Sequence, residues 1–182
     1  MLVRVLVALV LLTATIGARA DDAHDAEAAV LSFTTAFFSG NVAEAADMFH
    51  PEGHRALRSL MIHVAETTRD FKERREFYRI WNVKSLTELR RLDDKALFTG
   101  LFRRLWQEST PEFTAMWRAS KVSIIGSVRE GDTYHVVFRT HVSLQAGAED
   151  TVSLASVKQD DGRWKVVSSI EMDLMKRRLV SP

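Results

Sequence analysis

The stretch that decides the fold is KVSIIGSVREGDTYHVVFRTHVSLQAGAEDTVSLASVKQDDGRWKVVSSIEM, residues 121–172. It holds four runs rich in β-branched and aromatic residues, namely Lys121–Glu130, Thr133–Gln145, Thr151–Gln159 and Arg163–Met172. Strands favour such residues, and the Gly-Asp and Asp-Gly pairs between the runs suit tight turns. Because every connection is short, neighbouring strands should be antiparallel and form one four-stranded meander sheet.

Alternation along the second run predicts which side of this sheet is buried. One face carries Tyr134, Val136, Phe138, Thr140, Val142 and Leu144. The opposite face carries His135, Val137, Arg139, His141 and Ser143. The last run has a similar apolar stripe of Trp164, Val166, Ile170 and Met172. We expect the apolar face to meet the core, and the mixed face to lie in solvent or in a subunit interface.

Residues upstream of the sheet have the spacing of amphipathic helices. The first predicted helix, Asp22–Ser39, ends at Gly40, and Asn41 opens a short second helix that His50-Pro51 should stop. Between Gly53 and Trp81 the pattern fits either one long helix or two helices with a break near Thr67-Thr68. Three more helices are predicted to begin at Ser85, after Asp93-Asp94 and at Thr110-Pro111. The fold class is therefore α+β, with N-terminal helices packed on the sheet.

The first twenty residues have the three parts of a secretory signal peptide. Arg4 supplies a positive charge, Val5–Ile16 is an apolar run, and Ala18-Arg19-Ala20 is a small-x-small cleavage site. The alternative is a membrane anchor, but the run is short and Asp21-Asp22 follows at once. We expect residues 1–20 to be removed, leaving residues 21–182 as a single domain in the periplasm or outside the cell, without a stable membrane span.

Charge and cysteine content narrow the function further. Cleavage would remove Arg4 and Arg19 and no acidic residue, so the formal net charge changes from +1 to −1. A nearly neutral domain has no overall field to attract nucleic acid, and none is expected as a partner. The chain has no cysteine, which rules out thiol catalysis and thiolate metal sites.

Both ends of the predicted domain resemble the nuclear transport factor 2-like superfamily. The sequence Phe-Phe-Ser-Gly-Asn-Val-Ala-Glu-Ala, residues 37–45, is similar to the helix, break and short helix that open those domains. The strands around Gly131-Asp132 and the run Asp160-Asp161-Gly162-Arg163-Trp164-Lys165-Val166 are similar to their closing hairpins. The resemblance implies a curved sheet wrapped by helices into a cone with an apolar pocket. Such domains include enzymes, ligand binders and dimerisation modules, so the fold alone does not set the function.

Aromatic residues are the main hint of a ligand. In a hollow cone, some of them would line an apolar pocket instead of filling the core. The candidate pocket residues are Phe33, Phe37, Phe49, Tyr78, Trp106, Trp117, Tyr134 and Phe138. The leading hypothesis is a non-enzymatic domain that binds a small apolar ligand or a protein partner. The hypothesis includes a homodimer formed through the open sheet face. A structural dimerisation module with a filled cone is an alternative.

An enzyme of the isomerase or hydratase type is the other alternative, because some members of the superfamily use a carboxylate inside the cone. Asp47, His63, Tyr78 and Tyr134 are the candidate inward-facing groups, but none matches a catalytic motif, so no catalytic residue is assigned. Glu171 lies on the wrong strand face. No metal or cofactor is predicted: His50 and His54 have helical spacing, but Pro51 and Gly53 argue against a continuous helix between them.

Overall fold

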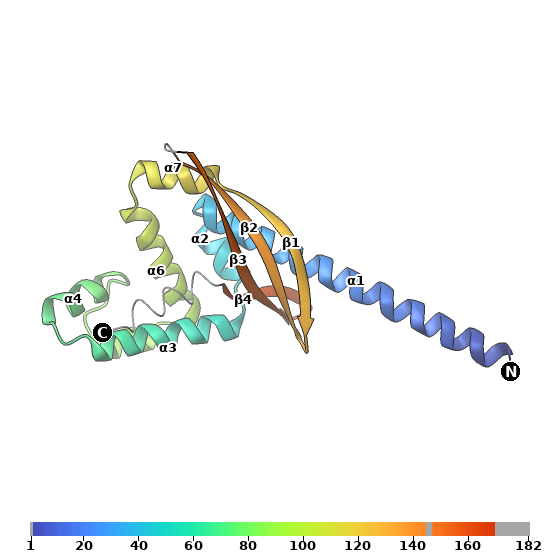
Figure 1. Cartoon of the computed structure of the whole chain (residues 1–182). Coiled ribbons are helices and arrows are strands. Elements are labelled where there is room, and N and C mark those ends of the chain that lie inside the picture. Colours follow the sequence, from blue (N-terminus) through green and yellow to red (C-terminus); the bar gives the residue numbers. More distant parts are fainter. Residues whose placement is uncertain (1, 145–146, 170–182) are drawn as a thin grey trace.

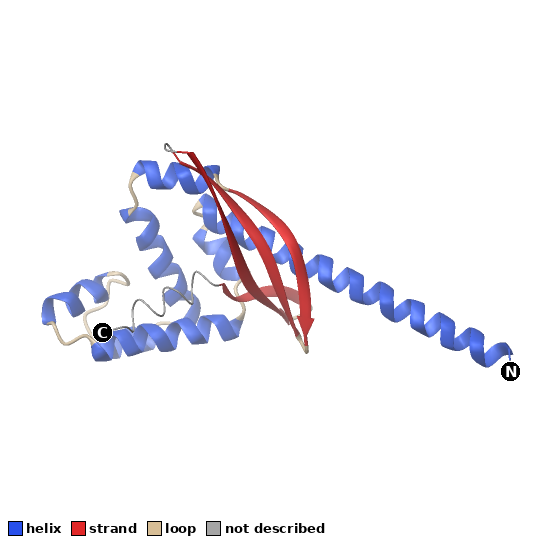
Figure 2. Cartoon of the chain, in the orientation of Figure 1, coloured by secondary structure: helices blue, strands red, loops and turns tan. Residues whose placement is uncertain are grey.

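The computed structural model describes residues 2–144 and 147–169, and it has an α+β fold in which helices precede a curved antiparallel sheet (Figures 1 and 2). The described helices are α1 Leu2–Ser39, α2 Val42–Asp47, α3 Pro51–Thr67, α4 Phe71–Arg79, α5 Leu86–Arg91, α6 Asp94–Glu108 and α7 Pro111–Ala119. The strands are β1 Lys121–Glu130, β2 Thr133–Leu144, β3 Gly147–Asp160 and β4 Arg163–Ser169. The predicted fold class is confirmed.

The sheet has the order β1-β2-β3-β4, so each strand pairs with its neighbour in sequence. Gly131, Asp161 and Gly162 adopt positive φ angles of 62°, 51° and 73° in the two tight turns. The third strand begins earlier than predicted, at Gly147, because the long β2 continues to pair with it as far as Leu144. The predicted stripe residues Ile170 and Met172 lie outside the described residues.

The predicted faces of β2 are confirmed. Tyr134, Val136, Phe138 and Thr140 are buried, whereas Arg139 is exposed. α1 contacts all four strands and, together with α2, lies on the concave side of the sheet (Figure 1). The inner face therefore carries the core, whereas Val128, Val152 and Leu154 on the outer face are exposed.

Helix ends follow the capping chemistry of the sequence. The side chains of Asn41, Ser85, Asp93 and Thr110 each accept a hydrogen bond from a backbone N–H in the first turn of the helix that follows. α1 ends before Gly40, which takes a φ of 82°. The region 53–81 contains two helices, and the break after Thr67 is close to the predicted position.

One helix boundary was predicted wrongly. Pro51 does not end a helix but begins α3, and His54 lies within that helix. Proline suits the first helical position because its missing N–H would have no partner there. The ring Nδ1 of His50 accepts a hydrogen bond from the N–H of Glu52 at 3.1 Å and so caps the helix. Gly53 allows close approach to β4, since a Cβ at this position would lie 2.2 Å from the Val167 carbonyl oxygen.

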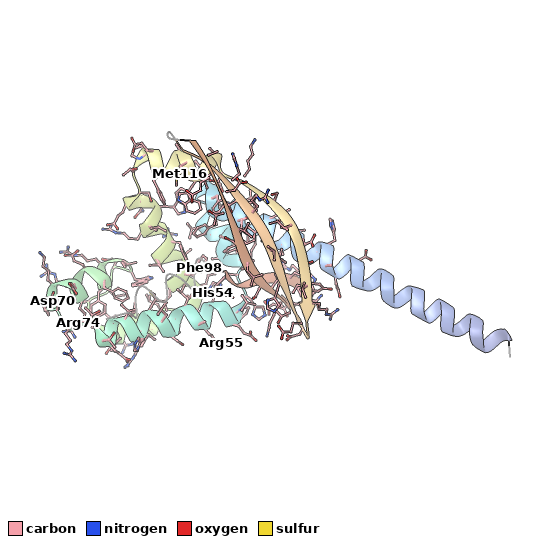
Figure 3. All side chains as sticks on the ribbon, in the orientation of Figure 1. His54, Arg55, Asp70, Arg74, Phe98 and Met116 are labelled. Atoms are coloured by element: carbon pink, nitrogen blue, oxygen red, sulfur yellow. The ribbon has the colours of Figure 1, made fainter. Side chains whose placement is uncertain are left out.

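The core consists of a main cluster beneath the sheet and a smaller cluster among the outer helices. Phe98 is fully buried in the main cluster, with its ring centroid 4.9 Å from that of Phe49 and 4.6 Å from that of Phe102. The ring of His54 meets Phe98 edge-on at 5.3 Å (Figure 3). The smaller cluster contains Ala65, Tyr78, Leu89 and Leu97.

Stability should depend on pH through His54. This ring is buried, hydrogen-bonds the Ala46 carbonyl at 3.0 Å, and has a pKa held below the ordinary 6.5, chiefly by desolvation. Between that lowered pKa and 6.5 the unfolded chain binds a proton that the folded chain does not. The free energy of unfolding should therefore fall as the pH drops below 6.5 and level off once the folded pKa is passed.

Urea denaturation of the wild type and of His54→Phe at about pH 7.5 and about pH 5.5 measures this dependence. The wild type should lose stability at the lower pH, and His54→Phe should lose less. Equal losses in the two proteins would show that other groups set the pH dependence.

Candidate functional site

A cavity of about 280 Å³ lies between the inner face of the sheet and the helices α1, α6 and α7. The helices contribute Val30, Phe33, Thr34, Phe37, Phe38, Phe102, Leu105 and Trp117. The strands contribute Phe138, Thr140, Val142, Thr151, Ser153, Ala155 and Val166. Leu105 and Thr151 are exposed, so the cavity reaches solvent beside α6 and β3.

Local periodicity explains why these residues meet. Val30, Phe33 and Phe37 recur at helical spacing and share one side of α1. On the strands, Phe138, Thr140 and Val142 alternate along β2, as Thr151, Ser153 and Ala155 do along β3, so each set points to the inner face.

The helical wall of the cavity is a connected group of aromatic rings. The ring centroids of Phe33 and Phe37 lie 6.0 Å apart, and Phe37 meets Phe102 edge-on at 5.0 Å. Phe38 and Trp117 approach to 4.5 Å. Rings in mutual contact restrict one another's movement, so this wall is held in place by its own packing.

Small side chains on the sheet explain why the space is not filled. Thr151, Ser153 and Ala155 on β3 lie opposite the large rings of the helices. In a filled core, large residues would interdigitate across this gap at the density of an organic crystal. The cavity therefore exists because the inward-facing residues of β3 are small.

The chemistry of the cavity is apolar with a few neutral polar groups. No acidic or basic side chain is among the described residues that line it. The lining residues that carry hydroxyl groups are Thr34, Thr140, Thr151 and Ser153. The Thr34 hydroxyl donates to the Val30 carbonyl at 2.8 Å within α1. Such a lining suits recognition by shape and apolar contact.

The structure brings four of the eight predicted pocket residues together and places the other four elsewhere. Phe33, Phe37, Trp117 and Phe138 line the cavity. The other four pack elsewhere in the protein. Phe49 packs against Phe33 and Phe98, and Tyr78 belongs to the smaller cluster. Trp106 lies beside Gly40, and Tyr134 meets Trp164 edge-on.

Sequence reasoning missed several lining residues that periodicity could have found. Val30 lies one helical turn before Phe33 and Thr34, and Thr140 and Val142 continue the inner face of β2 beyond Phe138. The small residues Ser153 and Ala155 were not predicted, because the candidate pocket residues were chosen for their aromatic rings, and this criterion overlooks small residues that leave space.

The candidate acid–base groups Asp47, His63, Tyr78 and Tyr134 are not among the residues that line the cavity. Asp47 pairs with Lys95 on the surface, and His63 is exposed. Glu171 lies outside the described residues.

In the part of the chain that the structure describes, no group of three or more His, Asp or Glu side chains is placed to hold a metal ion. Among the described helices, none combines the length and apolar character needed to cross a membrane.

Comparison with known proteins gives little further information. No protein-family model and no curated protein matches the chain. Among solved structures, a SEC-C motif containing protein from Rhodopseudomonas palustris is similar at 14% sequence identity, with a TM-score of 0.26. The similarity covers 52% of this chain and 65% of that one. A likeness this weak supports no inference about fold or function.

Proposed function

We propose that this protein is a non-enzymatic binding domain that holds a small apolar molecule in the cavity beneath its sheet. The observation that carries the proposal is the pairing of an aromatic wall with small residues on β3, which leaves about 280 Å³ unfilled. Burying apolar ligand surface there would contribute about 25 cal/mol per Å².

The volume sets the size of the ligand. An engineered apolar cavity of about 150 Å³ binds benzene, so roughly 25 Å³ serves each non-hydrogen atom. At that density a cavity of about 280 Å³ holds a molecule of roughly 11 non-hydrogen atoms. Bicyclic hydrocarbons and short branched chains fall in this range.

We also propose that the protein acts in the periplasm or outside the cell after removal of residues 1–20. The N-terminal half of α1 extends away from the sheet and the other helices (Figure 1). Ala23 packs against the core and Ala26 is fully buried. Cleavage before Asp21 would therefore keep the packed part of α1. The order of helices and strands supports the proposed resemblance to the nuclear transport factor 2-like superfamily.

A second proposed function, homodimer formation, is favoured by the outer face of the sheet. Exposed aliphatic side chains lie there on β1 and β3, namely Ile125, Val128, Val152 and Leu154. Arg139 and His141 lie on the same face beside Asp150. The Arg139 Nε is 3.8 Å from one carboxylate oxygen of Asp150, and the His141 Nδ1 is 2.6 Å from the other. A twofold-related copy would meet the same apolar patch and charges of both signs, as an isologous interface requires.

Native mass spectrometry of the protein purified from a periplasmic extract tests these proposals together. We expect the mass of residues 21–182 plus an apolar molecule of the size given above. A dimer without a bound molecule would favour homodimer formation over ligand binding as the function. A bare monomer would contradict the dimer and count against a tightly held ligand. An uncleaved chain would contradict the removal of residues 1–20.

A further inference from the structure

Phe71 is the most exposed large hydrophobic side chain in the described part of the chain. It is 71% exposed, compared with 67% for Val128 on the sheet. Phe71 begins α4, which lies at the end of the helices that is far from the sheet (Figures 1 and 3). At the other end of α4, the ring of Phe77 packs against Tyr78 and Trp81. An aromatic ring that is left in water would gain free energy by entering an apolar phase.

Three cations share the side of α4 that carries Phe71. Arg75 and Arg79 follow Phe71 at intervals of four residues, and Lys72 lies three residues before Arg75. Side chains three or four residues apart lie on one side of a helix, so these four are neighbours on the surface. All four are exposed, and together they form the α4 patch.

Two of the three acidic residues beside this patch lie off it. Asp70 accepts a hydrogen bond from the N–H of Glu73 at 2.8 Å and so caps the helix. Glu73 is two residues from Phe71 and two from Arg75, and residues at that spacing do not face each other on a helix.

The third acidic residue, Glu76, neutralises only part of the charge of the α4 patch. It pairs with Arg79 at 2.7 Å. Among the described residues, Lys72 and Arg75 make no ion pair. Two positive charges beside an exposed ring are therefore uncompensated.

A single aromatic ring among cations suits a lipid surface better than a protein partner. A stable protein interface buries about 1,200–2,000 Å² around a centre from which charged residues are depleted. The α4 patch offers one apolar side chain and three charges. Anionic lipids present negative charge over a whole plane, with an apolar phase just beneath it. Lys and Arg have long stems that let the charge stay at the headgroups while a neighbouring ring goes deeper.

We propose that the α4 patch binds the surface of a bilayer that contains anionic lipid. Lys72, Arg75 and Arg79 pair with the negatively charged headgroups, and the Phe71 ring enters the boundary between headgroups and acyl chains. The proposal goes beyond ligand binding and does not depend on it, because no residue of α4 is among the described residues that line the cavity.

Co-sedimentation with vesicles measures this binding, using the protein purified from a periplasmic extract. Vesicles of phosphatidylcholine alone are compared with vesicles that also contain phosphatidylglycerol, which is anionic. We expect binding to the mixed vesicles to be about 25-fold tighter, because each of the two cations without an ion pair contributes a factor of about 5. Added salt should weaken this binding. An uncleaved apolar N-terminus would bind both kinds of vesicle, so the comparison does not depend on cleavage.

Three variants test the residues of the α4 patch. Lys72→Gln and Arg75→Gln should each weaken binding to the mixed vesicles about 5-fold. Phe71→Ala should weaken it about 10-fold, because it removes the ring that leaves water. Arg118→Gln is the matched control, since Arg118 is exposed on α7, far from α4 (Figure 1), and its loss changes the net charge by the same amount. It should bind like the wild type.

Three outcomes would overturn the proposal. In the first, the wild type binds both kinds of vesicle equally or binds neither, so the patch attracts no anionic lipid. In the second, Lys72→Gln and Arg75→Gln weaken binding no more than Arg118→Gln does, so overall charge is responsible. In the third, Phe71→Ala binds like the wild type, so the ring stays in water. None of these results would affect ligand binding in the cavity.

Discussion

Phe98→Ala is expected to lower the free energy of unfolding by about 3–5 kcal/mol. The ring is fully buried in the main core and packs against the rings of Phe49 and Phe102. Truncation removes its apolar burial and leaves a void that rigid neighbours cannot close. This loss is a large share of the roughly 5–15 kcal/mol that stabilises a typical domain.

Urea denaturation followed by circular dichroism measures the effect of this truncation. The matched control is Phe71→Ala, because Phe71 is 71% exposed at the start of α4. It should change the free energy of unfolding by less than about 0.5 kcal/mol. A cost below about 1 kcal/mol for Phe98→Ala would mean that this aromatic cluster is not tightly packed.

Ala155→Leu is expected to weaken binding of a cavity ligand about 10- to 100-fold, because forcing extra methylene groups into a filled site costs roughly 1–3 kcal/mol. Ala155 is 2% exposed on β3, pairs with Val136, and faces the cavity. In the ligand-free protein the leucine side chain would occupy vacant space. Its stability should therefore stay close to that of the wild type.

The control for Ala155→Leu is Ala148→Leu, which makes the same change at an exposed position on the same strand. Calorimetric titration with tetralin, a bicyclic hydrocarbon, compares the two variants with the wild type. Ala148→Leu should bind like the wild type. Unchanged binding by Ala155→Leu, in a protein that remains folded, would place the ligand elsewhere.

Local sequence patterns predicted most of the fold. Alternation in residues 121–172 predicted the meander and the buried face of β2, and capping residues such as Asn41 and Ser85 located helix starts. These features depend on neighbours along the chain. Pro51 was misread because proline both ends and begins helices, and the choice between these roles depends on how His50 and Gly53 meet β4.

The cavity was harder to predict, because it depends on which residues face one another across the core. Phe49 and Phe33 are both phenylalanines with stacked rings, yet only Phe33, on α1, lines the cavity, whereas Phe49 follows α2 and bridges to Val166 of β4. The decisive feature is the small size of Ser153 and Ala155 opposite the rings, a tertiary relation between distant segments.

The central claim is that the cavity beneath the sheet holds an apolar ligand, and methyl NMR during titration with tetralin tests it most directly. We expect shifts at the methyl groups of Val30, Val142, Ala155 and Val166, which line the cavity. Those of Leu89 and Leu97 in the smaller cluster should stay unchanged. Shifts confined to the outer-face residues Val128 and Val152, or none at all, would contradict the claim.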